Sequence, residues 1–277
     1  MAQSPSGSGS LTAISGTLPS DNDNDVDMYR VCITEPASFS AQTSGTIIDP
    51  QLFLFDSTGK GVEARDDIVA GVQRQSYLTP GNPFSPTAAG TYYLAIDRYN
   101  SEPLSVGGKI FPDFGDARAG QIVGPTGPGG ASPVSGWTAE GDAANENGGT
   151  DYTIATAGTA FCLSFDGFFS PIDNDTVNSA KAGQTVPVKY RLVAANGTPV
   201  SDPSSFAGLT SQAAAGACAG QPSDAVETYS GNSGLQYLGD GNWQFNWKTP
   251  KSYEGQCRTM TMTLNDGSTH EASFLFK

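Results

Sequence analysis

The chain has 277 residues, which is enough for two ordinary domains. Its 28 acidic residues outnumber its 14 lysines and arginines, and the net charge of −14 argues against nucleic acid, whose binding needs basic residues that neutralise phosphates. No window of 18 apolar residues is present, so no membrane insertion is predicted. The 34 glycines and 18 prolines are typical of short strands joined by turns and predict an all-β fold.

The first ten residues, MAQSPSGSGS, have low complexity and predict a flexible tail. Met1 in front of Ala2-Gln3-Ser4 looks like an initiator methionine placed on a mature chain whose secretion signal has been removed. We therefore expect a secreted or cell-surface protein.

A loop dense in aspartate connects the first predicted strand, residues 11–18, to the second, residues 28–33. In an extended chain its four alternate aspartates would share one side at a spacing of about 7 Å. Calcium, which takes about six to eight oxygen ligands, would relieve their mutual repulsion. The alternative is a solvated acidic turn, in which the side chains serve turn chemistry only. The four candidate ligands are Asp21, Asp23, Asp25 and Asp27.

This loop is not an EF-hand, because Val26 and Cys32 stand where that motif needs glycine and glutamate. Any metal site must therefore draw ligands from elsewhere in the chain. The best candidates are Asp66 and Asp67, with Asp97 as a further one. The alternative for the Asp66-Asp67 pair is an ordinary turn.

Further strands follow in the first half of the chain. An alternating pattern or a short apolar run predicts strands over residues 38–42, 51–56, 90–97, 151–155 and 160–165. The apolar run at 51–56 suits a strand covered on both faces. Residues 113–150 are rich in glycine and proline and are expected to form a long loop, for which the composition favours disorder.

Four segments of the first half resemble the bacterial pre-peptidase C-terminal (PPC-like) domain. They are DVDMY at 25–29, DPQLFLFD at 49–56, DD at 66–67 and AGTYYLAI at 89–96. The resemblance implies a calcium-associated β-sandwich over residues 11–165, of the kind that accompanies secreted enzymes or occurs on surface proteins. The recurrence of the DD pair in that family strengthens the candidacy of Asp66 and Asp67 as ligands.

The second half is similar to the bacterial PxKF domain. The segments that carry this similarity are FFSPIDN at 168–174, KAGQTVPVKY at 181–190, WKT at 247–249, GQCR at 255–258, LNDGS at 264–268 and FLFK at 274–277. Tyr190 stands where the P-x-K-F signature of that domain has phenylalanine. The resemblance implies an accessory module of surface and secreted proteins with no assigned activity.

The residues of this half independently predict a sandwich. Trp243, Phe245 and Trp247 alternate with polar residues, and so do Met260, Met262 and Leu264. Each two-residue period gives one apolar face. About seven short strands over residues 166–277 fit an immunoglobulin-like topology. The predicted fold is therefore two β-sandwich domains in tandem, the second of them immunoglobulin-like.

The four cysteines lack C-x-x-C spacing, which favours disulfides over zinc binding or redox catalysis. Of the three possible pairings we predict Cys32–Cys162 and Cys218–Cys257. Cys32 and Cys162 each lie off the apolar face of a predicted strand, and the other two fall in the second domain. Such bridges indicate an oxidising compartment.

The chain offers little to a catalytic mechanism. It has one histidine, His270, and no nucleophile elbow or His-Glu-x-x-His motif. We therefore predict that it is not an enzyme. Tyr99 and Trp137 are candidates for stacking on sugar rings, although aromatic residues of a sandwich are more often buried.

The predicted function is that of a non-catalytic, secreted or cell-surface bacterial protein, structural or adhesive, such as an extracellular matrix component. Calcium and disulfides would stabilise it. One alternative is a carbohydrate- or polymer-binding accessory module. A second alternative is a subunit of an extracellular filament, in which an edge strand or the tail adds to a neighbour's sheet. The partners expected from these readings are an extracellular polysaccharide, a neighbouring surface protein or a second copy of the chain.

Overall fold

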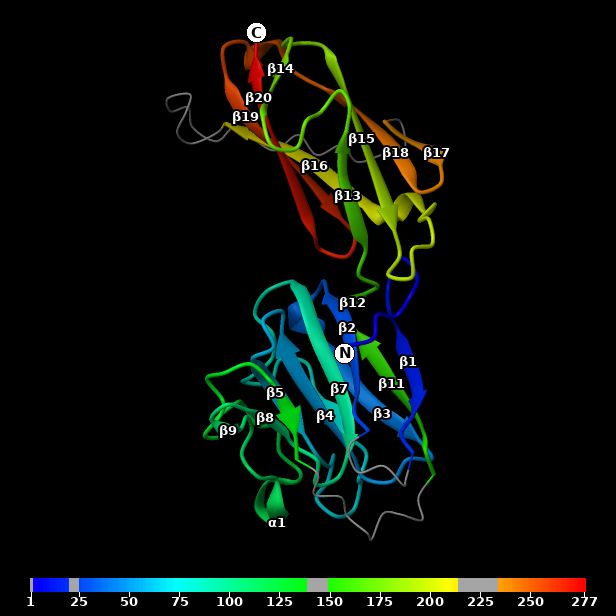
Figure 1. The fold of residues 1–277 in the computed structure, drawn as a ribbon, viewed down its shortest axis with the longest axis vertical. Helices are drawn as coiled ribbons and strands as arrows, with labels where there is room; N and C mark the ends of the chain where they lie inside the picture. Colours follow the sequence, from blue (N-terminus) through cyan, green and yellow to red (C-terminus); the bar gives the residue numbers. More distant parts are fainter. Residues whose placement is uncertain (1, 20–24, 139–148, 214–233) are drawn as a thin grey trace. The chain divides into compact units, whose positions relative to one another are not determined.

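The computed structural model describes residues 2–19, 25–138, 149–213 and 234–277, and it is all-β, as predicted (Figure 1). The chain divides into two compact units. The N-terminal unit comprises Met1–Pro5 and Ser10–Cys162, and the C-terminal unit comprises Ser6–Gly9 and Leu163–Lys277. Among the described residues, no helix has the length and apolar character needed to span a bilayer.

Two antiparallel sheets form the body of the N-terminal unit. One has the order β12-β2-β7-β4-β5 and the other the order β1-β11-β3-β6. The strands are β1 (Ala13–Thr17), β2 (Asp27–Ile33), β3 (Ser40–Gly45), β4 (Pro50–Asp56), β5 (Gly61–Arg65), β6 (Tyr77–Leu78), β7 (Gly90–Arg98), β11 (Asp151–Ala157) and β12 (Thr159–Ala160).

Strand β4 is buried on both of its faces, as its apolar run predicted. Leu52 and Leu54 belong to the core that also contains residues of the other sheet, such as Ile154. Phe53 and Phe55 point to the opposite face and belong to a separate apolar cluster. The five-stranded sheet is therefore covered on both sides.

The segment that follows β7 packs on the second face of this sheet. It contains β8 (Pro103–Ser105), β9 (Gly108–Lys109), α1 (Gly115–Arg118) and β10 (Gly136–Trp137). Phe111 and Phe114 of this segment are buried against Phe53. The disorder expected over residues 113–150 is therefore wrong for residues 113–138, whereas 139–148 lie outside the described residues.

Glycine in this segment serves close packing rather than mobility. A Cβ at Gly127 or Gly129 would collide with backbone carbonyl oxygens of residues 108–111. Only glycine lets two backbones approach so closely. Composition alone does not distinguish this use of glycine from its use in flexible linkers.

The N-terminal residues, for which the sequence predicted a flexible tail, pair with the N-terminal unit at two points. The backbone N–H of Gln3 donates to Met28 O at 2.7 Å, and Arg30 N–H donates back to Gln3 O at 2.8 Å. Ser10 forms a β-bridge with Ala160. These bonds need no apolar side chains, so low complexity does not prevent them.

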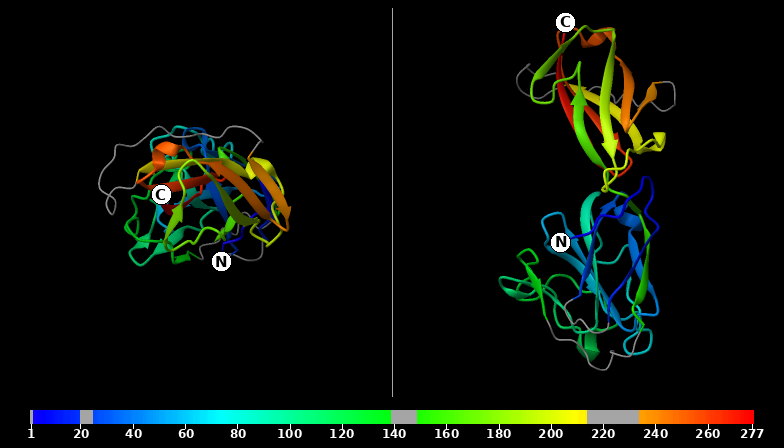
Figure 2. Two further views of the ribbon diagram at one scale, coloured as in Figure 1. Left: turned by 90° about the horizontal axis from the view of Figure 1, so that it is seen from above. Right: turned by 45° about the vertical axis from the view of Figure 1, so that its right-hand side comes forward.

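The C-terminal unit is a sandwich of two four-stranded sheets, β13-β15-β18-β17 and β14-β20-β19-β16, and the predicted immunoglobulin-like class is confirmed (Figure 2). Its strands are β13 (Ser164–Phe169), β14 (Val177–Ala180), β15 (Thr185–Val193), β16 (Phe206–Ala213), β17 (Leu235–Gly239), β18 (Asn242–Lys248), β19 (Cys257–Leu264) and β20 (Thr269–Phe276). Three short 3₁₀ turns complete the described elements of the chain: Pro36–Ser38, Pro203–Ser205 and Lys251–Tyr253.

The alternating residues of the C-terminal unit build its core. Trp243, Phe245 and Trp247 of β18 face Met260 and Met262 of β19 in one apolar cluster. The strand predicted over 160–165 is wrong, because β12 ends at Ala160 and β13 begins at Ser164, in the other unit. The apolar pattern runs unbroken across this boundary and gives no sign of it.

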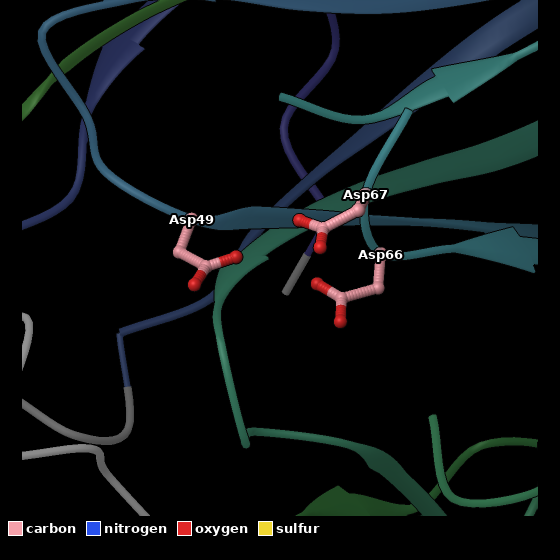
Figure 3. A group of neighbouring side chains, drawn as sticks. All are labelled: Asp49, Asp66 and Asp67. Carbon is pink, nitrogen blue, oxygen red and sulfur yellow. The ribbon is translucent and has the colours of Figure 1, made fainter. Parts of the chain in front are cut away.

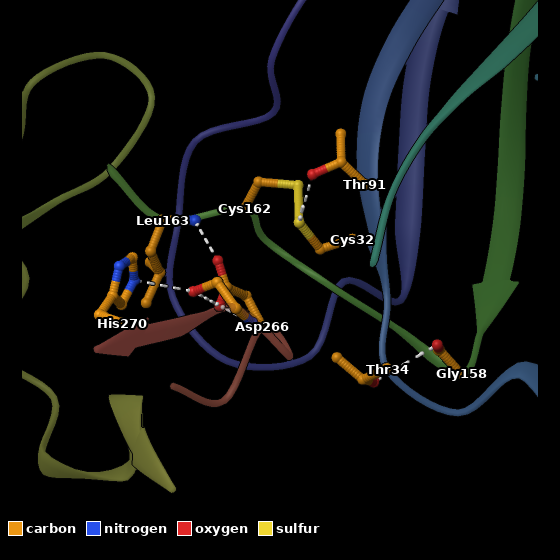
Figure 4. The surroundings of a disulfide bond; sticks show 9 residues. Cys32, Thr34, Thr91, Gly158, Cys162, Leu163, Asp266 and His270 are labelled. Carbon is orange, nitrogen blue, oxygen red and sulfur yellow. Dashed lines mark hydrogen bonds between the residues drawn. A yellow bond between two sulfur atoms is a disulfide. The ribbon is translucent and has the colours of Figure 1, made fainter. Parts of the chain in front are cut away.

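The predicted Cys32–Cys162 disulfide is confirmed (Figure 4). It joins β2 to the residues after β12, across 130 residues of sequence, with 5.2 Å between the two Cα atoms. The second predicted bridge, Cys218–Cys257, involves Cys218, which lies outside the described residues. The N-terminal unit is therefore closed covalently near its last residue.

Candidate metal centre

Three buried aspartates meet at one end of the five-stranded sheet (Figure 3). Asp49, Asp66 and Asp67 are 7%, 1% and 4% exposed. Each offers one carboxylate oxygen, and these three oxygens lie within 4.8 Å of one another. Figure 3 shows the three carboxylates turned toward a common space.

Strand pairing brings these residues together. Asp49 immediately precedes β4, and Asp66 and Asp67 immediately follow β5. Because β4 and β5 are antiparallel neighbours, the start of one lies beside the end of the other. Asp49 adopts a positive φ of 58°, which aspartate tolerates better than most residues. Its carbonyl accepts a hydrogen bond from Tyr99 N–H at 2.9 Å.

The backbone around Asp67 is held by Arg65. The guanidinium of Arg65 donates to four carbonyl oxygens, at distances of 2.8 to 3.1 Å: those of Asp67, Ile68, Tyr77 and Gly120. Asp67 itself accepts a hydrogen bond from Gly71 N–H through Oδ2, at 2.5 Å. The loop after β5 is therefore rigidly attached to the carboxylate cluster.

The cluster is short of positive charge. Burial, followed by the negative charges of Asp49 and Asp67, raises the pKa of the Asp66 carboxyl to about 8. Asp66 Oδ1 and Asp67 Oδ1 have no hydrogen-bond partner among the described residues. Arg74 pairs with Asp49 at 2.9 Å, but its side chain is 49% exposed. Burying several carboxylates with so little compensation is costly unless a cation joins them.

A fully buried amide lies beside Asp66. Gln51 of β4 is 0% exposed, and neither of its amide atoms has a hydrogen-bond partner in the described part of the chain. The amide partly offsets the rise in the pKa of the Asp66 carboxyl, as a nearby N–H group does, without reaching hydrogen-bonding geometry. The ligands that the trio itself offers are carboxylate oxygens, which suit a hard cation such as Ca²⁺.

A cavity of about 460 Å³ opens over the three carboxylates. The other residues that line it are Ala70, Gly71, Arg74, Tyr99, Gly115 and Ala119. The cavity is large enough to supply water or a small ligand to a bound cation. The cluster, which we call the aspartate trio, is therefore accessible although its members are buried.

The structure brings two of the predicted ligands together and adds one that the sequence analysis missed. Asp66 and Asp67 belong to the trio, and Asp49 is the added member. The signal for Asp49 was its position at the start of a buried strand, directly before Pro50. Asp97 lies opposite Gln51 in the register of β7 and β4 and is not a member of the trio. Burial raises the pKa of Asp97 to about 8.

The aspartate-rich loop is described only in part, because Asp21 and Asp23 lie outside the described residues. Asp27 accepts hydrogen bonds from Tyr152 Oη at 2.5 Å and from Gln3 Nε2 at 2.6 Å. Two protein donors therefore already bind the carboxylate oxygens of Asp27, which the sequence predicted to bind a cation. Burial and then the charge of Asp27 raise the pKa of Asp25.

The two aromatic candidates for sugar stacking have different surroundings. Tyr99 lines the cavity over the trio. Trp137 instead packs edge-on against Phe53 and Phe55, with ring centroids 5.3 and 6.2 Å apart. Trp137 is thus partly buried against the outer apolar cluster, and its role in stacking on a ligand stays a prediction.

His270 and Asp266 lie close together in the C-terminal unit (Figure 4), and Ser268 contacts both of them. Ser268 Oγ donates to Asp266 Oδ1 at 2.6 Å and lies 3.3 Å from His270 Nε2. A hydroxyl has one proton, and here it is given to the aspartate, so the histidine is not placed to remove it. Asp266 also accepts the backbone N–H of Leu163 at 2.8 Å, which is a structural contact.

No family model and no curated protein matches the chain. Among solved structures, the chain is similar to a chimeric titin Z1Z2-Z1Z2 tandem functionalized with a GRGDS peptide from fibronectin. The two are 10% identical, and the match covers 99% of this chain and 100% of that one with a TM-score of 0.23. This similarity is too low to support an inference about function.

Proposed function

We propose that the protein is a non-catalytic, secreted or cell-surface component with a structural or adhesive role, and that calcium bound by the aspartate trio stabilises its N-terminal unit. The observation that carries the proposal is the meeting of Asp49, Asp66 and Asp67 within 4.8 Å in a buried position. A cation there would hold together the start of β4, the end of β5 and the loop after it.

The chemistry of the trio favours calcium over other common ions. Its described members offer only carboxylate oxygens, whereas zinc sites in proteins use mainly histidine and cysteine. Magnesium demands a near-octahedral geometry, whereas calcium accepts irregular oxygen cages. When bound, the ion would supply the positive charge that Arg74 alone does not provide.

Three further observations support an extracellular, non-catalytic role. The Cys32–Cys162 disulfide suits an oxidising compartment. The two halves resemble modules of secreted and surface proteins. The one histidine lies in a structural network in which Ser268 donates to Asp266, rather than in a nucleophile arrangement.

Thermal unfolding of the full chain with Ca²⁺ and with a chelator tests the proposal. At a calcium concentration about 100 times the dissociation constant, we expect the N-terminal unit to melt about 5–10 °C higher than in chelator. Asp67→Asn should abolish this shift. Asp166→Asn, which changes a half-exposed aspartate of the C-terminal unit, is the matched control and should retain it. An identical melting curve with and without calcium would refute the metal centre.

A further inference from the structure

The cavity over the aspartate trio has features that a purely structural ion site does not need. It has a volume of about 460 Å³ and is bordered by Arg74 and Tyr99. Gly71 and Gly115, which line it, are exposed, so this edge of the cavity reaches solvent. A structural calcium site is usually closed by protein oxygens, whereas this one keeps an open side.

The trio does not complete a calcium coordination shell by itself. Calcium takes about six to eight oxygens. Asp67 Oδ2 already accepts from Gly71 N–H, and Asp49 Oδ2 accepts from Arg74, so part of the carboxylate capacity is in use. Some ligands must therefore come from the cavity, either as water or as oxygens of a bound molecule.

The charge of the site selects the kind of molecule. Three carboxylates are balanced by a divalent cation together with the guanidinium of Arg74. Arg65, which interacts with Asp67, and Glu102, which interacts with Asp66, add one charge of each sign and leave this balance unchanged. No net positive charge then remains to attract an anion, and a buried excess charge would be costly. A neutral molecule that offers paired oxygens, such as the vicinal hydroxyls of a sugar, is the best match.

The rim of the cavity can recognise such a molecule. Arg74 uses Nη1 to bind Asp49, and its half-exposed guanidinium carries further N–H donors. Tyr99 adds an aromatic ring, a group with an apolar face and a polar end. A few polar groups that converge in a concave site beside an apolar wall are typical of small-molecule sites.

We propose that this cavity binds a neutral sugar through a pair of vicinal hydroxyl groups, with Arg74 and Tyr99 as the residues that set its specificity. The inference rests on the proposed calcium centre, because the trio needs its cation before the site is neutral. Asp66 and Asp67 hold the ion in this arrangement, and the rim residues contact the sugar.

Ligand-observed NMR on the full chain tests the inference. The probes are methyl α-mannoside and methyl β-galactoside, with methyl 3-deoxyglucoside as a probe that has no pair of vicinal hydroxyls and galacturonate as a charged one. We expect a neutral glycoside to bind in Ca²⁺ and to bind at least about tenfold more weakly in chelator. The deoxy sugar and galacturonate should both bind more weakly than the best neutral glycoside.

Two variants separate this inference from the calcium centre. Arg74→Ala and Tyr99→Leu should each weaken glycoside binding at least about tenfold while the calcium-dependent rise in melting temperature remains. Arg191→Ala, in the C-terminal unit, is the matched control for loss of a half-exposed arginine and should change neither. Stabilisation by calcium without binding of any neutral glycoside would overturn the sugar site and leave the calcium centre standing. Glycoside binding that survives chelator or Arg74→Ala, or a preference for galacturonate, would also overturn the proposed sugar site.

Discussion

The two units differ in how their buried charged side chains are hydrogen-bonded. In the C-terminal unit Arg258 is 1% exposed, yet it donates to Ser211 and Gln256 and lies over the ring of Tyr253. Asp266, 2% exposed, accepts three hydrogen bonds, from Leu163 N–H and from the N–H and hydroxyl of Ser268. Each of these buried charges is satisfied by its own unit.

The N-terminal unit leaves its buried carboxylates incompletely bonded. Glu63, Asp66, Asp67 and Asp97 each have a buried oxygen that has no hydrogen-bond partner among the described residues. A buried carboxyl with too few partners either keeps its proton, as the raised pKa of Glu63 indicates, or needs a cation beside it, as we propose for the aspartate trio. We therefore expect calcium to raise the stability of the N-terminal unit and to leave that of the C-terminal unit unchanged.

The largest expected effect concerns the covalent closure of the N-terminal unit. Replacing both Cys32 and Cys162 by alanine opens a loop that spans 130 residues of sequence. Loss of this constraint should lower the free energy of unfolding of the unit by about 4 kcal/mol. Guanidinium unfolding followed by tyrosine and tryptophan fluorescence measures it. The C-terminal unit should unfold at the same denaturant concentration as before, and a comparable loss there would contradict the independence of the two units.

A second prediction concerns Glu63, which lies on β5 and is fully buried. Its Oε2 accepts from Asn82 Nδ2 at 2.6 Å, and burial raises its pKa from 4.5 to about 7. The folded state therefore holds a proton that the unfolded state releases between these two values. The stabilising contribution is complete below pH 4.5 and is lost as the pH rises to about 7, by about 3 kcal/mol in all.

Glu63→Gln removes this pH dependence while it keeps a side chain of the same shape. The variant should gain stability over the original protein as the pH rises from 4.5 to 8, measured by urea unfolding at several pH values. Glu271→Gln, an exposed position on β20, is the control and should leave the pH profile unchanged. Parallel profiles for Glu63→Gln and the original protein would exclude a buried acid with a raised pKa.

Asp66→Asn should change the stability of the N-terminal unit in opposite directions in chelator and in calcium. In chelator the variant should be more stable than the original protein, by about 1–2 kcal/mol, because one of three crowded carboxylates is gone. In calcium it should be less stable, because a ligand is lost. Thermal unfolding of both proteins in both conditions measures the crossover. Destabilisation of equal size in both conditions would mean that Asp66 serves packing and not a cation.

The smallest effect is expected at a surface ion pair of the C-terminal unit. Arg191 Nη1 lies 2.6 Å from Asp166 Oδ2, and both side chains are about one third to two fifths exposed. Exposed pairs contribute less than about 1 kcal/mol, so Asp166→Ala should shift the unfolding midpoint little and independently of calcium. A calcium-dependent shift in this variant would show that the ion also acts on the C-terminal unit.

Periodic patterns and apolar runs in the sequence predicted several strands and which of their faces are buried. The alternation of Trp243, Phe245 and Trp247 predicted β18, and the apolar run at 51–56 predicted a strand covered on both faces. The Cys32–Cys162 pairing is confirmed, although one of the two strands from which it was argued, residues 160–165, is absent and Cys162 lies between β12 and β13. The two strand inferences needed only a periodic pattern and the position of each residue within it.

The features that the sequence did not show depend on contacts between distant segments. Asp49 lies beside Asp66 because β4 and β5 pair, and no residue near Asp49 in the sequence indicates that these two strands are neighbours. The glycines of residues 127–130 serve close backbone packing, which composition cannot separate from flexibility. The end of β12 and the start of β13 fall within a continuous apolar pattern, so the boundary between the units was displaced in the prediction.

Differential scanning calorimetry of the full chain, in calcium and in chelator, tests the central claim most directly. Two transitions are expected, because the units have separate cores. Calcium should raise the transition of the N-terminal unit, identified by its shift in the Cys32/Cys162 double variant, and leave the other unchanged. Two transitions that both keep their positions when calcium is added would contradict the claim that the aspartate trio binds a cation.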